Sequence, residues 1–204
     1  MGFSSLLDIL GSTLIGGILM IILFRLNDAG IENTYNHSGE LTSQQNIKTV
    51  VSIIEYDFRK IGYCKDWSKI PRPNESIILA DSNKIKFIAD ILPDGNPPDG
   101  IVDTVYYYTG STNELLSTPN PHDKYLYRVI NGEDPVQVNL GVTQFSLTYF
   151  GALGDKLSFP ITVPGAISNI QIDVSVENIS AYDNKYSTVF WRQIRLSAQN
   201  LRNR

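Results

Sequence analysis

The chain has 204 residues, of which 42% are hydrophobic and 19% are charged, and its formal net charge is −4. This composition is that of a globular protein and excludes a disordered or collagen-like chain. The mild negative charge argues against a nucleic-acid-binding protein, which needs a clustered basic surface, and a single cysteine, Cys64, excludes an internal disulfide.

The first predicted element is a near-continuous apolar run over residues 6–24, LLDILGSTLIGGILMIILF. A membrane-spanning helix needs about 17–25 mostly apolar residues, so the run is long enough to enter a membrane. A secretory signal peptide fits less well, because residues 1–8 carry no Lys or Arg and no small-residue cleavage site follows the run. A buried helix of a soluble protein is the other alternative, but such helices are rarely this apolar. We therefore expect at least transient membrane insertion.

Three glycines and one carboxylate interrupt the apolar run. Gly11, Gly16 and Gly17 would let another helix approach closely, or they are ordinary glycines of a membrane helix. Asp8 is costly in an apolar environment and is expected to find a partner. That partner is the α-amine of another chain or Arg25 of a neighbour, unless Asp8 lies at the level of the lipid headgroups.

A second helical segment follows a polar stretch. Residues 25–45 are polar and contain Gly30 and Gly39, so the helix is predicted to bend or break there. Over residues 46–61 the apolar side chains recur at helical spacing, which predicts an amphipathic helix that packs on the following sheet. The stripe consists of Ile47, Val50, Val51, Ile54, Phe58 and Ile61. Gly62 is a stop signal, so residues 1–62 form an N-terminal helical rod and residues 63–204 a β-rich head.

The pattern of the head changes to the two-residue period of strands. Eight strands are predicted at residues 76–80, 84–88, 104–109, 125–130, 136–140, 144–150, 169–176 and 189–197. No second helical pattern separates them, so we expect antiparallel meanders and an α+β fold. Pro160 and Pro164 are predicted to lie in the connection between two groups of strands.

An Asp-rich segment at residues 90–103 is the best candidate for a ligand site. Its oxygen-bearing side chains are Asp90, Asp94, Asn96, Asp99 and Asp103. Such oxygens could hold a hard cation such as Ca²⁺, although the EF-hand spacing is absent. The alternative is a turn between strands, since Asp, Asn, Gly and Pro favour turns for conformational reasons. No other cofactor is expected.

The sequence contains no recognisable catalytic motif. His37 and His122 are the only histidines, and neither lies at metal-ligand spacing from other ligands. No nucleophile elbow, P-loop or dinucleotide-binding fingerprint is found. We therefore expect a protein that is not an enzyme.

Four motifs in order along the chain resemble type IV pilin-like proteins, most closely the minor pilins and pseudopilins of the PilW and GspJ type. Gly2-Phe3 opens the apolar helix as at the prepilin peptidase junction. The others are IIEYDFRKIGY at residues 53–63, IKF with DGIVDTVYY at residues 85–87 and 99–107, and LGVTQFSLTYF at residues 140–150. Counting Phe3 as the first residue, Leu7 stands at the fifth position, where the family has Glu, and Asp8 stands at the sixth.

The resemblance implies a structural subunit of a type IV pilus-like or pseudopilus filament. Its apolar helix would lie in the inner membrane before assembly and pack against identical or homologous subunits in an extracellular or periplasmic filament. It also implies that Gly2, Phe3, Asp8, Gly16 and Gly17 take part in processing or assembly. The alternative is a membrane-anchored binding module at the surface or in the periplasm that does not polymerise.

Overall fold

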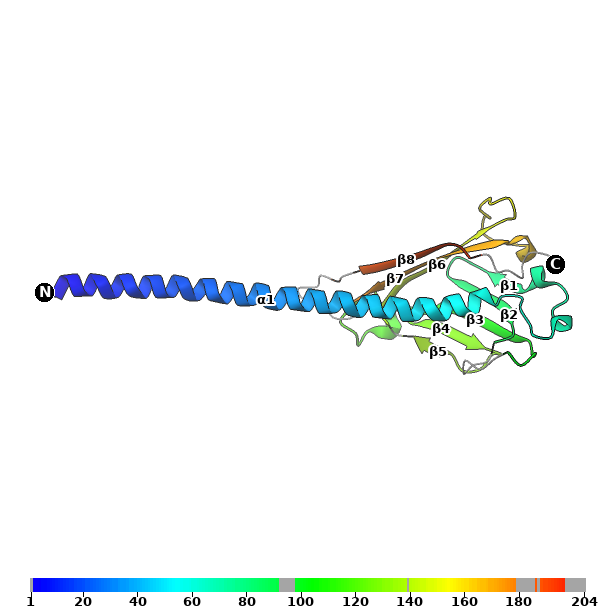
Figure 1. The fold of residues 1–204 in the computed structure, drawn as a ribbon, viewed down its shortest axis with the longest axis horizontal. Coiled ribbons are helices and arrows are strands. Elements are labelled where there is room, and N and C mark those ends of the chain that lie inside the picture. The colour runs from blue at the N-terminus through cyan, green and yellow to red at the C-terminus, as the bar shows by residue number, and fades with distance from the viewer. Residues whose placement is uncertain (1, 92–97, 139, 179–185, 187, 197–204) are drawn as a thin grey trace.

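The computed structural model describes residues 2–91, 98–138, 140–178, 186 and 188–196. One long helix, α1 (Gly2–Arg59), projects from a head of eight antiparallel strands (Figure 1). This arrangement confirms the predicted α+β fold with a long apolar N-terminal helix and an antiparallel β head. Short 3₁₀ helices in the connections are η1 (Trp67–Lys69), η2 (Pro73–Glu75), η3 (Thr112–Leu115) and η4 (Pro164–Ala166).

α1 runs without interruption through the segment where a bend or break was predicted, so that prediction is wrong. Gly30 and Gly39 lower helix propensity by about 1 kcal/mol each, but both keep the N–H that the helical hydrogen-bond ladder needs. Proline, which removes that N–H, first occurs at Pro71. At 1.5 Å per residue the 58-residue helix is about 87 Å long.

The strands form two separate sheets. The first contains β1 (Ile77–Ala80), β2 (Lys84–Ala89), β3 (Asp103–Thr109), β4 (Leu126–Ile130) and β5 (Val136–Val138) in chain order, and the second contains β6 (Val142–Phe150), β7 (Asn169–Glu177) and β8 (Thr188–Leu196). The division between sheets therefore falls between β5 and β6. Pro160 and Pro164 lie between β6 and β7 of one sheet, so their predicted place between two groups of strands is wrong.

The last third of α1 packs between the two sheets, and not on one sheet alone. The predicted stripe is buried in the core, except Val51, which is partly buried. Phe58 contacts the first sheet, with its ring 5.5 Å from that of Phe87 and 5.6 Å from that of Tyr107. The same helix also contacts β7 and β8 of the second sheet. A single hydrophobic core therefore joins α1 to both sheets.

A buried ion pair connects α1 to the first sheet. Asp57 is fully buried, and its Oδ2 accepts hydrogen bonds from Tyr107 Oη at 2.6 Å and Arg128 Nε at 2.6 Å. A second Arg128 nitrogen donates to Asp57 Oδ1 at 3.1 Å. Burial beside the Asp57 carboxylate raises the pKa of Tyr107 well above its usual range. Burial alone would lower the pKa of Arg128, but the hydrogen bonds and charge of Asp57 outweigh it and raise that pKa.

The run of three tyrosines in β3 is divided between the two faces of the sheet. Tyr107 points into the core, whereas Tyr106 and Tyr108 stack on the outer face with ring centres 4.9 Å apart. Tyr127 of β4 stacks on Tyr108 at 4.8 Å. Its hydroxyl donates to Glu114, which also closes a capping box at the start of η3. Tyr127 thereby holds the first part of the β3–β4 connection against the outer face of the sheet.

We predict that Glu114→Gln makes the head less sensitive to pH. The Tyr127 hydroxyl lowers the pKa of Glu114 from 4.5, so its contribution to stability is present above that value and is lost as pH falls through the lowered pKa. The same bond raises the pKa of Tyr127 from 10.0 to about 12, so the tyrosine's contribution is lost as pH rises through that value. Thermal unfolding at pH 7 and pH 3 should show a smaller loss in Glu114→Gln than in the wild type. Equal losses would contradict the prediction.

Candidate membrane and assembly helix

The first 37 residues of α1, residues 2–38, project from the head (Figure 1). Every side chain at residues 2–38 is exposed except those at Gly11 and Glu32, and Phe3 has 80% of its surface exposed. The most apolar 18-residue stretch within α1 has none of its residues buried. By length and composition this is a helix that can cross a membrane.

The length of the apolar run in the exposed helix agrees with the thickness of the hydrocarbon layer of a bilayer. At 1.5 Å per residue the apolar run of residues 6–24 is about 28 Å long, and the hydrocarbon layer is about 30 Å thick. Polar side chains within the run bond to the helix itself: Ser12 Oγ donates to the Asp8 carbonyl at 2.6 Å, and Thr13 Oγ1 donates to the Ile9 carbonyl at 3.0 Å. These hydroxyls therefore need no water, as a lipid environment requires.

The three glycines of the apolar run have no packing role among the described residues. A Cβ atom built at Gly11, Gly16 or Gly17 would meet nothing within 4 Å. Each glycine costs about 1 kcal/mol of helix propensity relative to alanine. Nothing inside the described chain offsets this cost. A close approach by a second helix remains the prediction for Gly16 and Gly17.

Asp8 shares one helix face with Ser12 and Gly16, because residues four apart lie above one another on a helix. Among the described residues, no Lys, Arg or His lies within ion-pair distance of Asp8. Its predicted partner in another chain therefore stays a prediction. Gly2 and Phe3 form the first turn of α1, and their predicted role in processing is not tested by their geometry.

The head contacts α1 from Gly39 onwards. A Cβ atom at Gly39 would lie 2.1 Å from Asn178 Nδ2 and 2.9 Å from Asn178 Cγ, so any other residue here would displace the Asn178 side chain. Ser43 is buried one turn later, and Asn46 Nδ2 donates to the Leu140 carbonyl at 3.2 Å. Gly39, predicted as a flexible point, thus serves as the close contact where the helix enters the head. We call this region, Gly39 to Asn46 with Asn178, the neck.

The Asp-rich segment holds its own backbone together. Asp90 is fully buried, and its carboxylate accepts hydrogen bonds from the backbone amides of Lys65 at 2.9 Å, Asp99 at 3.1 Å and Gly100 at 2.9 Å. Burial raises the pKa of the Cys64 thiol, which lies 3.6 Å from the same carboxylate.

Asp103 is buried in the same way and ties the segment to the next turn. Its carboxylate accepts from the Ile91 amide at 2.9 Å and from Asn131 Nδ2 at 2.7 Å. These bonds match the alternative reading, in which acidic residues shape a turn. Asp94 and Asn96 lie outside the described residues. Within the part of the chain that the structure describes, no three His, Cys, Asp or Glu side chains are arranged to hold a metal ion.

Calcium binding at this segment stays a prediction, and Asp99 offers the cleanest test. Asp99 is exposed, and its carboxylate accepts only from the nearby Ile101 amide at 2.7 Å among the described contacts, so Asp99→Asn removes a charge without emptying the core. If Ca²⁺ binds here, the variant should need more Ca²⁺ than the wild type to raise the thermal midpoint. The same response in both proteins would contradict the prediction.

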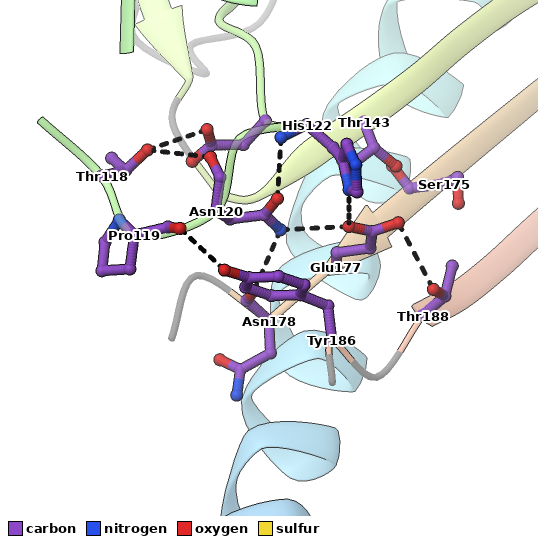
Figure 2. Close-up of polar contacts among 11 residues, drawn as sticks. Thr118, Pro119, Asn120, His122, Thr143, Ser175, Glu177, Asn178, Tyr186 and Thr188 are labelled. Carbon is purple, nitrogen blue, oxygen red and sulfur yellow. Dashed lines mark hydrogen bonds and ion pairs between the residues drawn. The ribbon is translucent and has the colours of Figure 1, made fainter. Parts of the chain in front are cut away.

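Sequence reasoning missed the buried ion pair of Asp57 and Arg128. The available signal was a charged residue directly before Phe58, inside the apolar stripe of an amphipathic helix. It also missed a polar network in which Asn120 Nδ2 and His122 Nδ1 each lie 3.1 Å from Glu177 Oε2 (Figure 2). Glu177 is 57 positions from Asn120 and 55 from His122, so no local pattern connects it to them.

Comparison with known proteins leaves the family open. No protein-family model matches the chain, and no curated protein matches it.

Proposed function

We propose that this protein is a structural subunit of a type IV pilus-like or pseudopilus filament, which assembles through its apolar N-terminal helix. The observation that carries the proposal is the single unbroken α1, whose first 37 residues project from the head while its last third lies in the core. The motifs at residues 53–63, 85–107 and 140–150 support the same assignment by resemblance.

The distribution of apolar side chains around α1 favours assembly in addition to anchoring. Apolar side chains occupy every side of the helix over residues 6–24, so no face is reserved for water. Lipid satisfies such a surface in the membrane, and a bundle of like helices satisfies it outside the membrane. Gly16 and Gly17, whose Cβ positions meet no other described residue, support close packing in that bundle. Before assembly the subunit would reside in the inner membrane, and afterwards in an extracellular or periplasmic filament.

The continuity of α1 also supports a structural role in a filament, because the helix can hold each head at a fixed distance from the packed helices. A flexible linker between anchor and head would let heads move independently, whereas an unbroken helix fixes the distance from each head to the packed helices. The polar residues 25–38 add about 21 Å of helix between the apolar run and the neck. Heads held at a constant distance from a helical core would form an ordered outer layer.

The second candidate is a membrane-anchored binding module that does not polymerise. Leu7 favours it, since the resembled family has Glu at this position and uses that carboxylate in assembly. Asp8 is one position later and one methylene shorter, and it lies about 100° away around the helix. In this alternative the same helix is only an anchor, and the head binds its partner as a monomer.

The deciding experiment asks where the full-length chain is found in cells. Filaments sheared from the cell surface or released into the periplasm should contain the protein along with its partner subunits, detected by immunogold labelling of the head. Deletion of residues 1–25 should remove the protein from the filament fraction and leave the head folded. A full-length chain found in membranes and never in filaments would contradict the proposal and favour the anchored module.

The mass of the mature N-terminus provides an independent measurement. A chain that begins at a methylated Phe3 would support processing at the Gly2–Phe3 junction. A chain that begins at Met1 would contradict processing at this junction. The filament experiment would still decide whether the protein assembles.

A further inference from the structure

The connection between β3 and β4, residues 110–125, lies beside the neck and is fixed to the second sheet. Asn120 is 1% exposed, and its side-chain amide donates to Glu177 Oε2 and to the Asn178 carbonyl, both at 3.1 Å (Figure 2). Asn120 Oδ1 in turn accepts from the His122 amide at 2.8 Å. All the polar atoms of this side chain are therefore engaged, so the main chain at Asn120 is held in one position.

The oxygen acceptors around the Thr118 hydroxyl, beside Asn120, outnumber the hydrogens that can be donated to them. Thr118 Oγ1 lies 2.8 Å from the Leu115 carbonyl and 2.9 Å from Asp123 Oδ1. It also lies 3.3 Å from the carbonyl of Asn120 (Figure 2). A hydroxyl has one hydrogen to donate. The Thr118 amide also reaches the Leu115 carbonyl at 3.0 Å, so Asp123 and the Asn120 carbonyl are left to compete for the hydroxyl.

Asp123 has a second oxygen that is more poorly satisfied. The residue is 1% exposed, and its Oδ2 is buried without a hydrogen-bond partner among the described residues. Within the same residues, no Lys, Arg or His lies at ion-pair distance from Asp123, since the adjacent His122 contacts Glu177. A buried carboxylate without a compensating charge is strongly destabilising.

We propose that the Thr118–Asn120–Asp123 loop binds a hard, oxygen-liganded cation, for which Ca²⁺ is the probe. The cation would take the carboxylate of Asp123, the main-chain carbonyl of Asn120 and the hydroxyl of Thr118. It would supply the positive charge that Asp123 lacks and coordinate the oxygens that one hydrogen cannot serve. The proposal does not depend on filament assembly.

The ligand chemistry selects the class of cation. All the available atoms are oxygens from a carboxylate, a carbonyl and a hydroxyl, which suit Ca²⁺ and not the nitrogen and sulfur ligands that Zn²⁺ prefers. Neighbouring ligands around Ca²⁺ lie about 2.8–3.4 Å apart, given bonds of about 2.4 Å. The spacings from Thr118 Oγ1 to Asp123 Oδ1 and to the Asn120 carbonyl, 2.9 Å and 3.3 Å, fall in this range.

A cation here would act on the contact between head and helix. Asn120 bonds directly to the Asn178 carbonyl, and the Asn178 side chain lies against Gly39 of α1. The Tyr186 hydroxyl also donates to the Pro119 carbonyl at 2.7 Å. Ordering residues 118–123 would therefore stabilise the neck from the side of the head.

The test is a Ca²⁺ titration of the full-length chain in detergent micelles after removal of metals with EDTA. The wild type should bind one Ca²⁺ per chain in this loop by equilibrium dialysis, with half-saturation at about 0.1–1 mM, the range of weak extracellular sites. Its thermal midpoint should rise over the same concentrations. Asp123→Asn, which keeps the size of the side chain and removes its charge, should bind at least tenfold more weakly.

Two further variants keep the result interpretable. Thr118→Val removes one ligand without changing the charge and should also weaken binding, which tests the site if Asp123→Asn fails to fold. Asp134→Asn is the matched control, because it removes an exposed carboxylate between β4 and β5, outside both candidate cation sites, and should leave this binding unchanged.

Three results would overturn the proposal. The first is no Ca²⁺ binding or thermal shift in the wild type at 10 mM, about ten times the weakest expected half-saturation, which would assign the loop oxygens to water. The second is unchanged Ca²⁺ binding in Asp123→Asn and Thr118→Val. The third is loss of all binding in Asp99→Asn, which would place the cation at the other segment.

Discussion

Replacing Asp57 with alanine is expected to lower the free energy of unfolding of the head by about 3–5 kcal/mol, because it leaves the Arg128 guanidinium and the Tyr107 hydroxyl without their shared acceptor. Arg128 keeps only 14% of its side-chain surface exposed, so water replaces the lost carboxylate poorly. This loss is a large part of the total stability of a domain of this size, which is typically about 5–15 kcal/mol.

The loss can be measured through the only cysteine. Cys64 is buried with a raised thiol pKa, so alkylation at neutral pH should be slow in the folded head and fast after unfolding. Denaturant titrations with this readout give the free energy of unfolding. Tyr107→Phe is the matched control: it removes one hydroxyl, keeps the ion pair and should cost about 1–3 kcal/mol. An Asp57→Ala loss no larger than that of Tyr107→Phe would contradict a central role for the ion pair.

The second large effect is expected from Ile15→Arg in the exposed helix. Arginine at the centre of a membrane helix costs about 3 kcal/mol on insertion scales, whereas isoleucine is slightly favourable, so insertion should weaken more than a hundredfold. Ile15 is 60% exposed and lies far from the head, so the free energy of unfolding of the head should not change. Resistance of the membrane-bound protein to alkaline extraction measures the insertion.

Ile31→Arg is the control for that experiment. Ile31 is also exposed on α1 but lies in the polar stretch that follows the apolar run. The same substitution there should leave the protein in the membrane fraction. If both variants extract equally, the apolar run is not the membrane-spanning segment. Loss of filaments without loss of membrane retention in Ile15→Arg would instead indicate a helix needed for assembly alone.

The elements of this fold could be predicted from the sequence wherever one periodic pattern decides the structure. All eight strands lie within three residues of their predicted bounds, and the apolar stripe from Ile47 to Ile61 is buried as predicted except at Val51, which is partly buried. These patterns report burial on one face, which is a local property of a strand or helix.

The features that depend on distant contacts could not be predicted. Gly39 looked like a helix breaker, yet it is the glycine on which Asn178 packs from 139 positions away. The separation into two sheets depends on which strands pair. Nothing in the sequence between β5 and β6 indicates that these two neighbouring strands belong to different sheets. The burial of Asp123 is imposed by the tertiary fold, so no local pattern marks it.

The unbroken α1 also gives the molecule a fixed rotational phase. Each residue of an α-helix turns the chain by 100°, so the azimuth of the head is locked to the face that carries Asp8, Ser12 and Gly16. Inserting one residue among residues 25–38 would rotate the head by 100° while moving it only about 1.5 Å outward, whereas inserting seven would return it to within about 20°. The length of this stretch thus sets a direction as well as a distance, and substitutions that keep the helix unbroken leave both unchanged.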